Sequence, residues 1–177
     1  MLRTKNHTHS NRTIIKCAKV VILNKKTLKI VVIGLALALI VLQFIRPDQN
    51  NPAINVANTL ESTTSVPDDV ASILKRSCND CHSNTTGYPW YAQVSPFSWL
   101  LDDHIREGRN ELNLSVWGTY ETHSKVKKLE EICEQVQSAA MPLPSYLWIH
   151  RDAALREGEV KLLCDWAEQE KRSVLEQ

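Results

Sequence analysis

The longest apolar run in the chain lies near its N-terminus. Residues 28–45 read LKIVVIGLALALIVLQFI, and apart from one Lys, one Gly and one Gln they are aliphatic or aromatic throughout. As a helix that rises about 1.5 Å per residue, this run would be roughly 27 Å long, close to the thickness of the hydrocarbon core of a bilayer. The pattern therefore predicts one membrane-spanning helix at residues 28–45.

Helical periodicity returns in four segments further along the chain. Pro67 and Pro96 suit the first turns of the first two segments, and Gly108 suits the end of the second. No stretch alternates apolar and polar residues as a half-buried strand would, so the fold is predicted to be all-α. The apolar positions that recur every three or four residues are Val70, Ile73 and Leu74; Leu100, Leu101, His104 and Ile105; Val126, Leu129, Cys133 and Val136; and Val160, Leu163, Cys164 and Ala167.

The residues between the apolar run and the first of these helices are mostly polar. They are rich in Asn, Pro, Ser and Thr and show no sustained apolar period, which is typical of a linker. The chain is thus expected to consist of a basic tail at residues 1–27, a transmembrane helix at 28–45, a linker at 46–65 and one helical domain at 66–177.

Charge is distributed unevenly on the two sides of the apolar run. Residues 1–46 hold nine of the 21 Lys and Arg residues and none of the 20 Asp and Glu residues. The positive-inside rule therefore predicts a cytoplasmic N-terminus and a periplasmic helical domain, attached to the inner membrane by a single span. A cleaved signal peptide is the alternative, but its apolar region would be shorter, and QFIRPDQNN after the run offers no A-x-A-like cleavage site.

The helical domain opens on a cysteine motif, Cys78-Asn79-Asp80-Cys81-His82. Two cysteines two residues apart with a histidine directly behind are the signal for covalent attachment of a c-type haem. Two thiols at this spacing can form thioethers with the two vinyl groups of one porphyrin, and the histidine is then placed under the iron. The motif predicts one haem c bound covalently by Cys78 and Cys81, with His82 as the proximal iron ligand.

A C-x-x-C pair has other uses in proteins, and two of them fit this sequence less well. A thioredoxin-like redox pair belongs near a βαβ pattern, which the sequence lacks. A zinc site would need two more ligands, and Cys133 and Cys164 occur singly, without the paired spacing of a zinc ribbon or finger.

The second axial ligand is predicted to be Met141. Met1 lies on the cytoplasmic side of the expected membrane helix, whereas Met141 is followed by Pro142 and Pro144, which favour a helix-free loop that could carry a thioether over the ring. Histidine and methionine together are the ligands of cytochromes c. Two alternatives stay open: Met141 could be an ordinary core residue, and His104 could be the distal ligand instead.

Several blocks of the chain, in the same order, are similar to a known family. They are CNDCHSNTTGYPWYAQVSPFSWLLDDHIREGRNELNLSVW at residues 78–117, EICEQVQSAAMPLPSYLWIH at 131–150 and LLCDWA at 162–167, with QFIRPDQNNP at 43–52. The chain resembles the bacterial haem-binding domain family of small membrane-anchored monohaem c-type proteins. The resemblance implies an all-helical, cytochrome c-like domain on the outer side of the cytoplasmic membrane.

The resemblance also implies the same haem site, with Cys78 and Cys81 as attachment points and His82 and Met141 as ligands. Family members often have Gly shortly before the Met-Pro pair, whereas this chain has Ala139 and Ala140. The expected function is single-electron transfer between redox partner proteins, without catalytic residues and without a nucleic-acid partner. A haem enzyme or ligand sensor with an open distal site is the alternative.

Two more cysteines fall in the expected periplasmic domain. Cys133 and Cys164 lie on the apolar faces of two predicted helices, and an oxidising compartment permits a disulfide between them. They could equally be two buried thiols, and no spacing rule decides between these alternatives. Cys17 is expected on the cytoplasmic side.

Overall fold

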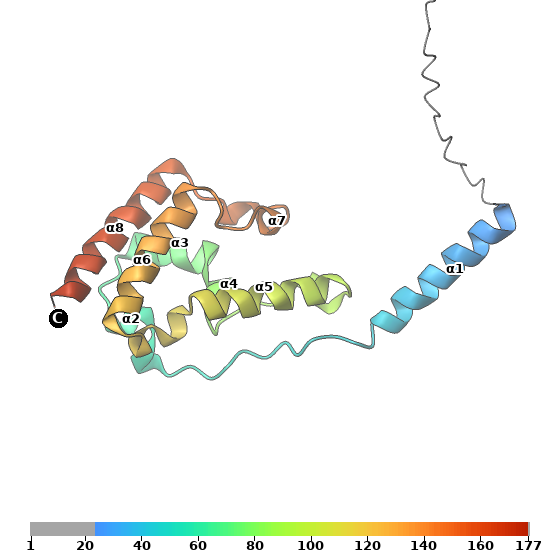
Figure 1. Cartoon of the computed structure of the whole chain (residues 1–177), viewed down its shortest axis with the longest axis horizontal. Helices are drawn as coiled ribbons and strands as arrows, with labels where there is room; N and C mark the ends of the chain where they lie inside the picture. The colour runs from blue at the N-terminus through green and yellow to red at the C-terminus, as the bar shows by residue number, and fades with distance from the viewer. Residues whose placement is uncertain (1–23, 177) are drawn as a thin grey trace, which may run out of the picture. The chain divides into compact units, whose positions relative to one another are not determined.

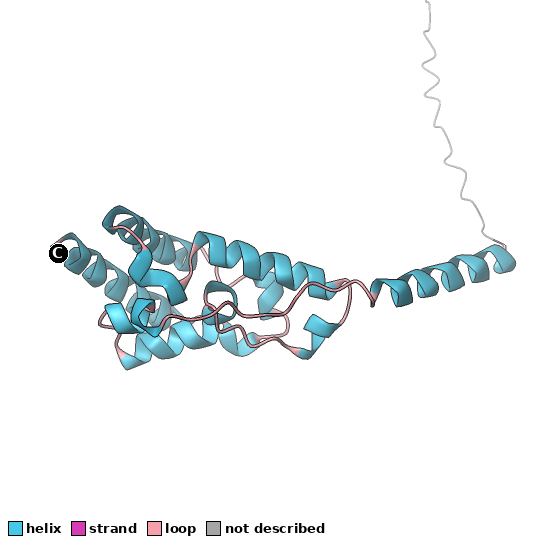
Figure 2. Cartoon of the chain, turned by 90° about the horizontal axis from the view of Figure 1, so that it is seen from below, coloured by secondary structure: helices cyan, strands magenta, loops and turns pink. Residues whose placement is uncertain are grey.

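The computed structural model describes residues 24–176, and within that range it contains helices and loops but no strand. The all-α prediction is therefore confirmed for this part of the chain (Figures 1 and 2). The described residues divide into two units, 24–38 and 39–176. Cys17 and most of the predicted basic tail lie outside the described residues.

Helix α1 is Lys25–Leu42, so it begins and ends three residues before the predicted bounds of 28–45. It includes Lys25, Lys26 and Lys29, since lysine has a high helix propensity and lets the helix begin ahead of the apolar run. The large apolar side chains of α1 from Leu28 to Val41 are exposed to solvent. Between residues 24 and 176, no helix has both the length and the apolar composition that a membrane span needs.

The core of the second unit is formed by three helices of the predicted pattern: α3 (Asp68–Ser77), α6 (Thr122–Gln137) and α8 (Glu157–Leu175). Helices α6 and α8 lie side by side (Figure 1), and α3 packs against α8. Their apolar faces enclose Trp117 from η3 (Leu114–Thr119). The buried residues of this core are Leu60, Val70, Ile73, Leu74, Leu114, Trp117, Leu129, Ile132, Val136, Leu163, Trp166, Ala167 and Val174.

A disulfide joins α6 to α8 through Cys133 and Cys164. Their Cα atoms are 4.9 Å apart, within the range that a disulfide requires. Of the two alternatives that the sequence leaves open, the structure therefore has the disulfide rather than two buried thiols. The link braces the C-terminal half of α6, which leads into the loop that carries Met141.

The remaining helices are short, except for α5 (Phe97–Glu111). The sequence predicts that α5 ends at Gly108, but the helix continues to Glu111, because Gly108 is a packing contact rather than a C-terminal cap. The short elements are η1 (Val56–Asn58), α2 (Leu60–Thr63), α4 (Asn79–His82), η2 (Trp90–Gln93), α7 (Pro144–Leu147) and η4 (Arg151–Ala153).

The predicted linker at residues 46–65 is partly folded. Helices η1 and α2 both contact η3, and the side chain of Leu60 is completely buried in the core. A single leucine between polar neighbours leaves no periodic signal, which explains why the sequence pattern does not indicate this contact. The folded domain therefore begins before residue 66.

Candidate functional site

The cysteine motif forms one tight turn at the junction of α3 and α4. Cys78 separates the two helices, and its carbonyl accepts hydrogen bonds from the backbone N–H groups of Cys81 and His82, at 3.1 and 2.9 Å. Residues three and four positions apart in such a turn lie on the same side of it. Both thiols are free. The turn therefore presents two thiols and an imidazole together, as the sequence predicts from their spacing.

The imidazole of His82 is held by backbone carbonyls of α5 and of the residue that caps its C-terminus. Its Nδ1 atom lies 2.9 Å from the carbonyl oxygen of Gly108 and 3.1 Å from that of Leu112. Because both partners are acceptors, Nδ1 carries the proton and donates it, and the lone pair on Nε2 is free. Burial lowers the pKa of His82, against the opposing effect of these two carbonyls, so the neutral ring is favoured. This is the tautomer that a metal-ligating histidine requires.

Gly108 allows α5 to approach the motif closely. A Cβ atom at this position would lie 2.8 Å from the carbonyl oxygen of Cys81 and 3.1 Å from its Cβ. Both contacts are shorter than ordinary van der Waals distance, and the nearest one is with backbone. Only glycine thus lets the carbonyl at position 108 reach His82.

Replacing Gly108 with alanine is expected to lower the free energy of unfolding by about 1–3 kcal/mol, the usual cost of overpacking a tight contact. It should also separate the carbonyl from His82. The matched control is Gly158→Ala in α8, where an added Cβ meets nothing within 4 Å, and here stability should be unchanged or slightly raised. Urea unfolding of both variants tests this; equal midpoints for Gly108→Ala and the native chain would contradict it.

Two adjoining cavities, of about 330 and 230 Å³, open beside the motif. The larger has mainly apolar walls from α3, α5, α6 and α8, and the smaller is lined by Cys81 and by His104 of α5. Cavities of a few hundred cubic ångströms are of the size that holds small ligands and cofactors. The residues that line both are Ser77, Cys78, His82, Glu111, Met141 and Pro142.

Met141 thus lies on the same cavities as His82 and Cys78, although it is far away in the sequence. His104, the alternative distal ligand, lines only the smaller one. The structure therefore brings the four residues that the sequence singles out, Cys78, Cys81, His82 and Met141, to the smaller cavity, and His104 lines that cavity too.

An unpaired polar atom lies in the wall shared by the two cavities. The Oγ atom of Ser77 is buried and has no hydrogen-bond partner among the residues that the structure describes. Buried polar groups are nearly always paired, so a hydroxyl in this state beside a cavity indicates a site that a ligand completes. Free thiols, a neutral imidazole with an available Nε2, a thioether and apolar walls fit a haem.

The end of α6 presents Met141 through a left-handed turn at Ala139, whose φ is 55°. The backbone N–H groups of Ala139 and Ala140 donate to the carbonyls of Val136 and Gln135, at 3.3 and 3.0 Å, which is the Schellman pattern of helix termination. The N–H of Met141 also donates to Gln135, at 3.1 Å. The cap thus reverses the chain directly before the proposed ligand.

Glycine at position 139 should stabilise this turn. Alanine has a steric penalty of about 1 kcal/mol in the left-handed region, so Ala139→Gly is expected to raise the free energy of unfolding by several tenths of a kcal/mol to about 1 kcal/mol. Ala140 does not have a positive φ, so the control Ala140→Gly should be neutral or destabilising. Thermal unfolding should show a higher midpoint for Ala139→Gly and an unchanged or lower midpoint for Ala140→Gly; equal shifts of the two variants would contradict this geometry of the cap.

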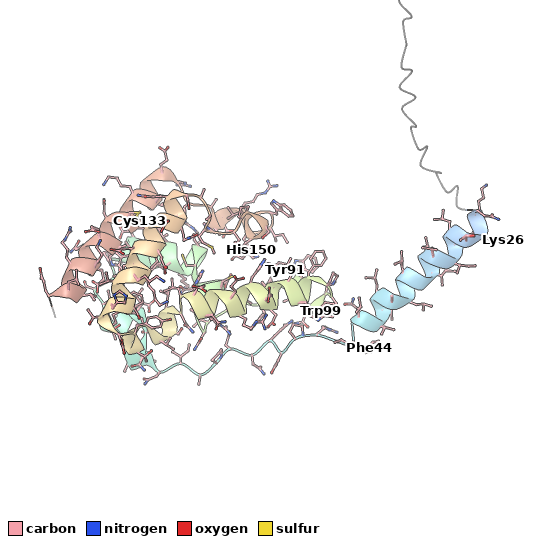
Figure 3. All side chains as sticks on the ribbon, in the orientation of Figure 1. Lys26, Phe44, Tyr91, Trp99, Cys133 and His150 are labelled. Atoms are coloured by element: carbon pink, nitrogen blue, oxygen red, sulfur yellow. A yellow bond between two sulfur atoms is a disulfide. The ribbon has the colours of Figure 1, made fainter. Side chains whose placement is uncertain are left out.

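The loop after Met141 is fastened to the cysteine motif. The hydroxyl of Tyr146 donates to the carboxylate of Asp80 at 2.7 Å, and the Tyr146 ring stacks on His150 with 4.2 Å between ring centroids. His150 in turn shares a 2.8 Å hydrogen bond with the hydroxyl of Tyr91; both residues are labelled in Figure 3. Burial, and then Asp80, raise the pKa of Tyr146.

Asp80 and Tyr146 therefore couple the two halves of the site, although no sequence pattern singles them out. Asp80 occupies a variable position inside C-x-x-C-H, and Tyr146 lies 66 residues further along the chain. A pattern within one segment carries no information about such a pair. Only the fold shows that the segment after Met141 is bonded to the turn that contains His82.

The alternative uses of the cysteine pair fit less well. Burial raises the pKa of Cys78 to about 12 and that of Cys81 to about 11, whereas thiol–disulfide exchange needs a readily formed thiolate. A zinc site cannot recruit Cys133 and Cys164, because they are joined in a disulfide. Between residues 24 and 176, no group of three or more His, Cys, Asp or Glu side chains converges as a metal site would.

Comparison with known protein families gives one match. The profile of the family described as a haem-binding domain matches residues 37–169, which is most of the chain and includes every residue of the site described above. No curated protein and no solved structure gives a match.

Proposed function

The chain belongs to the haem-binding domain family, and from this premise we propose that it holds one haem c through thioether bonds to Cys78 and Cys81. His82 and Met141 are the proposed axial ligands. The observation that carries the proposal is that all four residues line the smaller cavity while Nδ1 of His82 is bonded to two carbonyls, which leaves Nε2 as the available ligand atom.

The proposed activity is the transfer of single electrons between redox partner proteins. A bound haem would supply an iron that alternates between its ferric and ferrous states. The protein's part is to keep both ligands in place: α5 fixes the orientation of His82, and the bond between Tyr146 and Asp80 restrains the loop of Met141. A thioether ligand raises the reduction potential relative to a second imidazole, and the apolar walls exclude water from the site.

We also propose that residues 28–45 attach the protein to the inner membrane and that the haem domain lies in the periplasm. The support is the continuous apolar sequence with exposed side chains, preceded by lysines, and a disulfide in the domain that follows. Membrane fractionation tests the attachment: the full chain should remain with membranes after an alkaline carbonate wash, and its release by the wash would contradict it.

A redox titration followed by visible absorption tests the electron-transfer proposal. The purified full chain should show a six-coordinate, low-spin spectrum and titrate reversibly as a single one-electron step. A high-spin spectrum that changes on addition of cyanide would instead indicate an open distal site, as in a haem enzyme or ligand sensor. The absence of a Soret band would contradict haem binding altogether.

A further inference from the structure

An exposed apolar surface lies at one end of the domain, around the first turns of α5. We call it the aromatic surface. Trp90 is 76% exposed and Phe44 is 86% exposed, values rare for such large apolar side chains. Phe44 and Trp99 are labelled in Figure 3. The members of the aromatic surface are Phe44, Ile45, Trp90, Val94, Phe97, Trp99 and Leu100.

Hydrogen bonds hold this surface against the segment that directly follows α1. The side-chain amide of Gln43 donates to the carbonyl of Ser95 at 3.1 Å and accepts from its N–H at 3.0 Å. The indole N–H of Trp99 donates to the carbonyl of Ile45 at 3.0 Å. Because α1 ends at Leu42, Phe44 and Ile45 of the aromatic surface follow the exposed apolar run within three residues along the chain.

The composition of the surface favours lipid over a protein partner. Residues 88–101 contain no Asp, Glu, Lys, Arg or His, although 23% of the chain is Asp, Glu, Lys or Arg. Docking surfaces for soluble partners gain their orientation and association rate from complementary charges, and this stretch has none. Tryptophan, by contrast, is enriched where a protein meets the boundary between lipid headgroups and acyl chains.

We infer that the aromatic surface inserts into this boundary region of the membrane. The inference rests on the proposed membrane attachment and adds a second contact to it. A domain docked in this way has one end fixed at the lipid surface, so the orientation of its redox site toward membrane-bound partners is restricted rather than random.

Quenching of tryptophan fluorescence by brominated lipid tests the inference with the full chain. The protein is bound to vesicles of phosphatidylcholine and phosphatidylglycerol, with or without bromine on the acyl chains, and binding is verified by flotation. A bound haem would also quench tryptophan, but equally in both kinds of vesicle. The ratio of tryptophan emission with and without bromine therefore reports contact with lipid alone. Trp117 and Trp166 are buried and should contribute little to this ratio.

The native chain should emit less in brominated vesicles, and Trp90→Phe combined with Trp99→Phe should remove most of the difference. The comparison variant Trp148→Phe changes a tryptophan that is 79% exposed and lies two residues from His150, the partner of Tyr91, so it should remove a smaller part of the difference. If the protein floats with the vesicles but emits equally in both kinds, the inference is wrong and the proposed membrane attachment still stands. If Trp148→Phe removed the difference and the double variant preserved it, the lipid contact would lie away from Trp90 and Trp99, and the inference would also be overturned. Failure to float would overturn both the inference and the membrane attachment.

Discussion

A chain in which Cys78 and Cys81 are both replaced by alanine is expected to carry no haem after denaturation. Thioether bonds survive denaturants, so the native chain should keep its haem through a denaturing gel and stain for haem peroxidase activity. The double variant has no group that can form these bonds, and the expected loss is complete. Each single variant keeps one thiol and should retain part of the stain.

The control for this experiment is the other cysteine pair. Cys133→Ser combined with Cys164→Ser removes a disulfide that closes 31 residues, which should cost about 3–4 kcal/mol of stability by the loop-entropy relation. It removes no attachment point, so a stained band should remain. Haem that leaves the native chain during electrophoresis would contradict covalent attachment.

Replacing Met141 with leucine is expected to remove the distal ligand with little other change. Leucine has a similar volume, so the structural cost should stay below about 1.5 kcal/mol, but it has no sulfur to bind iron. The spectrum should become high-spin. Met141→His should keep a low-spin iron and lower the reduction potential, by a fraction of the roughly 0.8 V range that axial ligands control. Visible absorption and redox titration measure both effects.

His104→Gln separates Met141 from the alternative ligand. Because Met141 is the proposed ligand, replacing His104, which lines the smaller cavity, should leave the spin state and the reduction potential unchanged. If His104→Gln produced the high-spin spectrum and Met141→Leu did not, the iron would have two histidine ligands, and the assignment of Met141 would be wrong.

The long helices of the domain could be predicted because each buries one face. Val70, Ile73 and Leu74 in α3 recur at the helical period, and the same holds for the apolar positions of α6 and α8. The C-x-x-C-H spacing is similarly local, since one turn is enough to place Cys78, Cys81 and His82 on one side.

The features that the sequence could not indicate depend on contacts between distant segments. In the sequence, Gly108 looks like a glycine that ends a helix. Only the close approach of α5 to Cys81 shows that it is a packing contact inside the helix. Leu60 is a lone apolar residue, so its burial leaves no period. The bond between Tyr146 and Asp80 joins two segments whose proximity is set by the whole fold.

Mass spectrometry of the denatured, unreduced full chain tests the central claim most directly. We expect the mass of the polypeptide plus one haem, and after digestion the added mass should be on the peptide that contains Cys78 and Cys81, with neither cysteine open to alkylation. A polypeptide without added mass, in which both cysteines are alkylated, would contradict the account.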